Sequence, residues 1–216
     1  MKRFHILIAA LATFLGLLPV GVPAGDSVGG YVPPFRGAPS VRVSGGSRGI
    51  SQTGVLDLVA PDHLSLSASD QPHLYWYLSD DLPYPVILAI IDPNAVDPVF
   101  EGTIAESAER GIQGVDLSEL NVKLRPGVDY QWSVSVVEDA SQRSKDRFAS
   151  AQIRYQPHAG KISGNALQRS RAWAADGYWY DAVAAVSDKP DAAQRVQRAA
   201  LAEQVGLDQI AAFDRR

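Results

Sequence analysis

The sequence predicts a mainly β chain, in which an antiparallel β-sandwich is followed by helices. From Val55 to about Tyr155, short runs rich in Val, Ile, Tyr and Trp alternate with turn residues. Within this region, Leu-Arg-Pro-Gly-Val-Asp-Tyr at 124–130 leads into an alternating strand, which is typical of the tyrosine corner of immunoglobulin-like domains. After Pro157 the composition becomes helical. We therefore predict an immunoglobulin- or fibronectin-like antiparallel sandwich with a C-terminal helical hairpin.

Residues 1–24 have the features of a secretory signal peptide. Lys2 and Arg3 precede an apolar run, and the small-residue exit site ends at Ala24. The apolar run is only about thirteen residues long, whereas a membrane-spanning helix needs about twenty. We expect cleavage after Ala24 and export to the periplasm or the extracellular space, without stable membrane insertion of the mature chain. The alternative is an uncleaved anchor.

Residues 25–54 are rich in Pro, Gly, Ser and Arg, and we expect them to be extended. Prolines at this density remove backbone donors and prevent regular helix. Three arginines, Arg36, Arg42 and Arg48, recur at intervals of six residues in this segment. Guanidinium groups suit planar contacts with carboxylates or other anions, so these residues could recognise a partner. The alternative is that they dock onto carboxylates of their own chain.

Residues 55–157 are predicted to form the sandwich. Alternation places Leu74, Trp76 and Leu78 on one face of their strand, and Tyr130 and Trp132 on one face of a later strand. We expect both of these faces to point into the core. The predicted strands are Leu56–Val59, Leu64–Ser67, His73–Leu78, Val86–Ile91, Val99–Ile104, Gly111–Leu117, Asp129–Val137 and Phe148–Tyr155.

Residues 158–216 are predicted to be a helical hairpin appended to the sandwich. The first helix should run from Asn165 to about Ser187. Asp191 should cap the second helix, because Gln194 three residues later completes a capping box. Gly206 is expected to end that helix in a left-handed conformation, before a last short turn at 208–213.

An aromatic turn lies within the first of these helices. Tyr178, Trp179 and Tyr180 follow one another, so they cannot all point to one side of a helix. Trp179 lies off the apolar stripes and could be an exposed anchor for a partner. The alternative is that the neighbouring sandwich covers it. We take Tyr178, Trp179 and Asp181 as candidate interaction residues, in addition to the three arginines.

Composition argues against several classes of function. Without cysteine the chain cannot form disulfides, thiol active sites or thiolate metal sites. Removing Lys2 and Arg3 leaves 18 of the 20 basic residues against 24 acidic ones, a formal charge of −6. Nucleic acids and anionic membranes attract positively charged surfaces, so neither is an expected partner. The few histidines lack metal-site spacing, and we predict neither a metal nor another cofactor.

An enzymatic role is the main alternative to binding. Gly45–Gly49 matches the Gly-x-Ser-x-Gly elbow of serine hydrolases, with Ser47 as nucleophile, but no helical pattern follows it as that elbow requires. A pair of turn carboxylates could instead act on glycosides, although such residues are equally typical of a solvated surface. A second alternative is a fragment that docks through its helical hairpin.

Five motifs occur in order over about residues 31–213, at 31–39, 42–49, 72–78, 124–132 and 177–182. Together they resemble an exported bacterial family, known as domain of unknown function 928. The resemblance implies a signal peptide and no established catalytic residues, and it favours an envelope or extracytoplasmic sensor protein as partner. We therefore predict a non-catalytic interaction or accessory module of the cell envelope.

Overall fold

The computed structural model describes residues 30–35, 54–142 and 146–216. The part of the chain so described is mostly β, with a helical region at its C-terminal end. The strands are β1 (Leu56–Leu58), β2 (Ser65–Ser67), β3 (His73–Leu78), β4 (Val86–Ile91), β5 (Phe100–Ala105), β6 (Gly111–Asp116), β7 (Asp129–Val136) and β8 (Arg147–Tyr155). The helices are α1 (Ala166–Ala175), α2 (Trp179–Ala184), α3 (Ala192–Gln204) and α4 (Asp208–Asp214).

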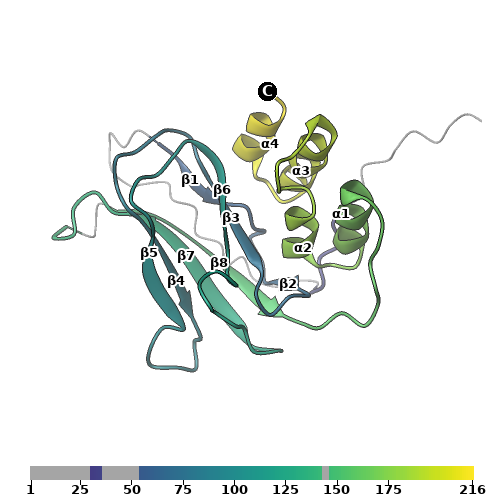
Figure 1. Cartoon of the computed structure of the whole chain (residues 1–216), viewed down its shortest axis with the longest axis horizontal. Coiled ribbons are helices and arrows are strands. Elements are labelled where there is room, and N and C mark those ends of the chain that lie inside the picture. The colour runs from purple at the N-terminus through teal and green to yellow at the C-terminus, as the bar shows by residue number, and fades with distance from the viewer. Residues whose placement is uncertain (1–29, 36–53, 143–145) are drawn as a thin grey trace, which may run out of the picture.

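The strands form two sheets (Figure 1). The smaller sheet has the order β1-β3-β6 and is antiparallel throughout. The larger sheet has the order β2-β8-β7-β4-β5, and its β2 runs parallel to β8. The expectation of a wholly antiparallel sandwich is therefore wrong at this edge. Strand spacing predicts hairpin neighbours, whereas β2 and β8 lie at opposite ends of the strand region.

One core joins the two sheets and the helices. Leu74, Trp76 and Leu78 of β3 are buried, as are Tyr130 and Trp132 of β7, which confirms the predicted inward faces. The same core includes Trp179 of α2 and Leu201 of α3. The helices therefore contribute apolar side chains to the core that the two sheets line, and do not only rest on the surface of the sheets.

The predicted tyrosine corner is present at the entry to β7. The hydroxyl of Tyr130 accepts a hydrogen bond from the backbone N–H of Arg125, at 3.0 Å. Gly127, between them, has a φ of 75°, a conformation that favours glycine. The backbone N–H of Gly127 in turn donates to the carbonyl oxygen of Tyr155, at 2.9 Å. The corner thus fixes the loop before β7 against the end of β8.

Tyr130→Phe is expected to lower the free energy of unfolding by about 1–2 kcal/mol, because the Arg125 N–H loses its acceptor while the buried ring keeps its packing. Urea denaturation of the two proteins measures the difference. Tyr84→Phe is the matched control, since Tyr84 is a half-buried tyrosine outside the corner. Equal effects of the two substitutions would contradict a stabilising role for the corner bond.

The first helical segment differs from its prediction. The single helix expected from Asn165 to Ser187 is two helices, α1 and α2, and the predicted hairpin is a group of four helices. The chain breaks at Gly177, whose φ is 86°. A Cβ at this position would lie 3.1 Å from the carbonyl oxygen of Val32, so the N-terminal segment passes directly over the glycine. The sequence does not predict this contact between the N-terminal segment and Gly177, because a single glycine within a helical pattern is often tolerated.

The second helical segment agrees with its prediction. Asp191 and Gln194 form the expected capping box at the start of α3. Gly206, with a φ of 71°, follows the end of that helix. A further capping box, between Asn165 and Gln168, begins α1. Both helices therefore start at residues that satisfy otherwise unpaired backbone N–H groups.

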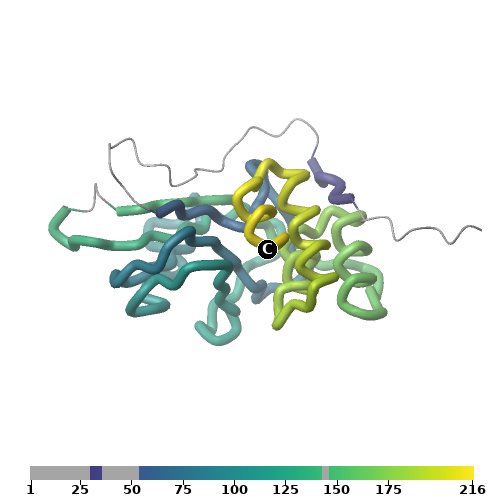
Figure 2. Tube along the Cα trace, turned by 90° about the horizontal axis from the view of Figure 1, so that it is seen from above, coloured from purple at the N-terminus to yellow at the C-terminus, as the bar shows by residue number. Residues whose placement is uncertain are grey.

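All four helices lie together on one side of the strands (Figure 1), and residues 30–35 run beside them (Figure 2). The backbone N–H of Tyr31 donates to the side chain of Gln204 in α3, at 2.6 Å. The N–H of Val32 donates to the carbonyl oxygen of Ala174 in α1, at 3.0 Å. Residues 30–35 thus bridge α1 and α3. Over the described ranges, none of the helices combines the length and apolarity needed to cross a bilayer.

Candidate interaction surface

The candidate residues from the sequence separate into two groups. Arg36, Arg42 and Arg48 lie outside the described residues, as does Ser47 of the glycine-rich elbow. Tyr178, Trp179 and Asp181 lie at the start of α2, where the helices meet β2 and β3. The structure therefore places only this second group.

Trp179 is completely buried. Its indole N–H donates to the carbonyl oxygen of Val59, at 2.8 Å, and its ring packs edge-on against Tyr31, with 5.0 Å between ring centroids. The idea that Trp179 is an exposed anchor is therefore wrong, and the alternative that the sandwich covers it is confirmed. Trp179 does not fit the predicted apolar stripes because those stripes assume one continuous helix. In the structure the chain breaks at Gly177, so Trp179 belongs to a separate helix.

Tyr178 is also buried, with 8% of its surface exposed. Its ring packs edge-on against His158 at 5.1 Å and lies 5.4 Å from the ring of Trp173. His158 in turn contacts the carboxylate of Asp176, with 3.1 Å between Nε2 and Oδ2. Tyr178 is thus part of an aromatic cluster that closes the turn between α1 and α2.

Asp181 is a partly buried carboxylate between α2 and β2. Burial raises its pKa to about 6, although the N–H of Ala68 and the hydroxyl of Ser67 donate to the carboxylate and partly offset the shift. The Ala68 N–H lies 2.8 Å from Oδ2. This carboxylate therefore joins the helices to the strand region and titrates near neutral pH. A role of Tyr178 and Asp181 in binding stays a prediction.

Asp181→Asn should stabilise the protein at pH 7 relative to pH 3.5. Ionisation of Asp181 is disfavoured in the folded state, so its contribution is fully present below pH 3.8 and is lost as the pH rises through about 6. The gap between 3.8 and about 6 corresponds to about 3 kcal/mol. The measurement is the stability difference between variant and wild type at the two pH values, with Asp208→Asn as control. A difference that does not change with pH would contradict the raised pKa.

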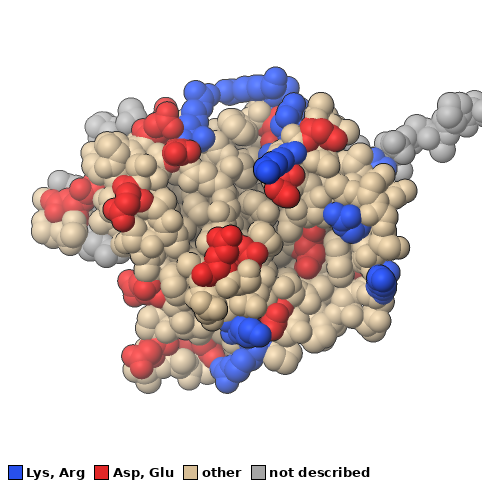
Figure 3. All heavy atoms as spheres, viewed as in Figure 1, with Lys and Arg blue, Asp and Glu red and all other residues tan. Residues whose placement is uncertain are grey.

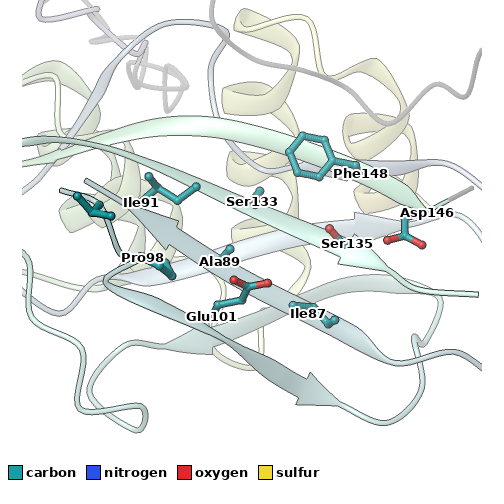
Figure 4. A pocket seen from close by; sticks show the side chains of 10 residues that line it. Ile87, Ala89, Ile91, Pro98, Glu101, Ser133, Ser135, Asp146 and Phe148 are labelled. Carbon is teal, nitrogen blue, oxygen red and sulfur yellow. The ribbon is translucent and has the colours of Figure 1, made fainter. Parts of the chain in front are cut away.

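A groove of about 430 Å³ lies on the outer face of the larger sheet (Figure 4). Its floor is made by Ile87 and Ala89 of β4 together with Ser133 and Ser135 of β7. The remaining lining residues come from β4, β5, β8 and the loops beside them, and they are Ile91, Val96, Pro98, Glu101, Asp146 and Phe148.

The groove exposes apolar side chains on a face that antiparallel sheets usually leave polar. Ile91 is 42% exposed and Phe148 is 40% exposed, and Val96 in the loop after β4 is fully exposed. The amino-acid sequence itself carries a signal for this apolar surface. Val86–Ile91 is apolar at every position, which is typical of a strand covered on both faces.

The charges at the groove are acidic. Glu101 and Asp146 line it, and among the described residues none that lines it is basic. Figure 3 shows acidic side chains over the strands and their loops in that view, and basic side chains beside the helices and at the lower end of the strand region. The groove therefore combines an apolar floor with negative charge.

A second cleft, of about 290 Å³, lies between the β3–β6 face, the connection from α2 to α3, and Arg198 of α3. The ring of Tyr75 covers Gly114, where a Cβ would come within 2.6 Å of the ring. His73 and Asp116 pair at its edge, at 3.1 Å. Arg198 also lines the cleft, but its guanidinium is already bonded to the buried carboxylate of Asp214. The described residues of the cleft therefore offer no unpaired lysine or arginine to an anionic ligand.

Comparison with known proteins identifies a family. A family model described as Domain of Unknown Function (DUF928) matches residues 43–214, which is more than half of the 216 residues. No curated protein matches the chain. The matched span includes the tyrosine corner, the groove and the helical region. The resemblance seen in the motifs is thereby confirmed, and the chain belongs to the DUF928 family.

Proposed function

We propose that this protein is a non-catalytic interaction module of the cell envelope, which binds a partner protein through the groove on its larger sheet. The observation that carries the proposal is the exposed apolar floor and wall of that groove, chiefly Ile87, Ile91 and Phe148. Exposed apolar surface of this kind is typical of sites that another molecule covers. The predicted signal peptide supports an exported protein, in the periplasm or outside the cell.

The sheet topology supports an immunoglobulin- or fibronectin-like sandwich as the scaffold of this module. In chain order, β1, β3 and β6 share one sheet, as strands A, B and E do in immunoglobulin domains. The strands β4, β7 and β8 share the other sheet, as strands C, F and G do. The tyrosine corner at the start of β7 is at the position that such domains use. The groove then lies on the outer face of the C-F-G sheet.

An envelope protein or an extracytoplasmic sensor protein is the partner we propose. The family resemblance favours such a partner, and a rigid sheet face is suited to a docking role because its side chains are held by backbone pairing on both sides. Arg36, Arg42 and Arg48 stay a predicted second contact.

Crosslinking in the intact envelope, followed by mass spectrometry, tests the proposal. We expect a specific partner with the wild-type protein, and its loss in the variant Phe148→Lys, which places a positive charge in the groove wall. Val196→Lys is the matched control, because Val196 is 52% exposed on α3 and lies outside the groove. A partner that is crosslinked equally in wild type and Phe148→Lys would contradict a role for the groove, as would the absence of any specific partner.

A further inference from the structure

We infer that the groove recognises an arginine or lysine side chain of the partner, flanked by apolar residues. This inference rests on the proposed function and specifies the chemistry of the segment that is bound. It follows from the way in which apolar and acidic side chains share one surface in Figure 4.

The floor of the groove suits the aliphatic part of a long cationic side chain. Arginine and lysine carry three or four methylene groups, which they often lay along apolar surface while the charged end stays in a polar place. Ile87 and Ala89 offer such a surface on β4. Phe148 stands over the same surface from β8, and its ring can also attract a cation.

The carboxylate of Glu101 receives the charged end. Glu101 lies on β5 beside the apolar floor, and Asp146, before β8, lines the opposite side of the groove (Figure 4). Glu101 is exposed, so its oxygens can accept from a ligand without the loss of a buried structural bond. Charge-assisted hydrogen bonds from a guanidinium or an ammonium group to carboxylate are among the stronger polar contacts in proteins.

Other occupants fit this surface less well. A second copy of the chain in a two-fold contact would bring two sets of the same acidic residues into one interface, where they would repel. An anionic ligand would meet the same repulsion. A wholly apolar ligand would remove water from Glu101 without replacing its hydrogen bonds, which is costly for a charged group. A cation beside apolar groups satisfies both parts of the groove.

A matched pair of peptides tests the inference. The probes are acetyl-Leu-Arg-Leu-amide and its citrulline counterpart, which has nearly the same shape but no charge. Titration is followed through the methyl NMR signals of Ile87 and Ile91. We expect the arginine peptide to shift these signals and to bind about tenfold more tightly than the citrulline peptide. Glu101→Gln should remove most of that preference, whereas Glu106→Gln, an exposed glutamate outside the groove, should keep it.

Three results would overturn the inference: equal binding of the two peptides, shifts confined to other parts of the protein, or no shift of either isoleucine. The envelope experiment separates this failure from failure of the proposed function. If Phe148→Lys still abolishes the crosslinked partner, the groove is the docking site and only the cationic side chain is wrong. If Phe148→Lys leaves the partner in place, the docking site itself is wrong.

Discussion

Replacing Trp179 by alanine is expected to lower the free energy of unfolding by about 3–5 kcal/mol, the usual cost of removing a large buried aromatic side chain. The ring is completely buried between α2, the N-terminal segment and the end of β1. Its removal leaves a cavity beside Tyr31 and an unpaired carbonyl oxygen at Val59. Chemical denaturation, followed by the fluorescence of the remaining tryptophans, measures the loss.

Trp179→Phe separates the two contributions. Phenylalanine fills most of the same space but cannot donate to the carbonyl oxygen of Val59, so about 1–2 kcal/mol should be lost. An exposed position supplies the control, since Val196→Ala on α3 should change the stability by less than about 0.5 kcal/mol. A loss for Trp179→Ala as small as that of Val196→Ala would show that the helices do not share the core of the sandwich.

The same residue shows what sequence periodicity can and cannot predict. The strands β3 and β4 were predicted with their observed bounds, because alternation and turn residues are local properties. The burial of Trp179 depends on contacts with Tyr31 and Val59, which are far away in the sequence. The positions of apolar residues around one helix cannot show contacts with such distant residues. The break at Gly177 also rotates the residues after it relative to those before it.

The groove depends on the sequence in part. Val86–Ile91 has apolar residues on both faces of its strand, which indicates a second covered surface in addition to the core. The acidic side chains at the groove were not predictable in the same way, because Glu101 and Asp146 come from β5 and from the residue before β8, and only the sheet order β8-β7-β4-β5 brings them to one face.

Asp214→Ala is expected to destabilise the protein by about 3–5 kcal/mol, because it leaves a buried guanidinium without its counter-charge. The Nε of Arg198 donates to Asp214 Oδ2 at 2.7 Å, and Nη2 donates to Oδ1 at 2.6 Å. The side chains are 5% and 0% exposed. Nη1 also donates to the hydroxyl of Ser187, at 3.1 Å, so the guanidinium joins α3, α4 and the end of the α2 region.

An exposed ion pair between the same helices shows how much of the loss expected for Asp214→Ala is due to burial of the pair. Glu203 and Arg215 join the same two helices, α3 and α4, but their side chains are 42% and 49% exposed. Glu203→Gln should therefore cost much less than Asp214→Ala. The double variant Arg198→Met with Asp214→Leu should recover much of the stability lost in Asp214→Ala, since a buried pair replaced by apolar groups of similar size is often tolerated. If Asp214→Ala costs no more than Glu203→Gln, water must reach Arg198 and the pair cannot be what fixes α4 against α3.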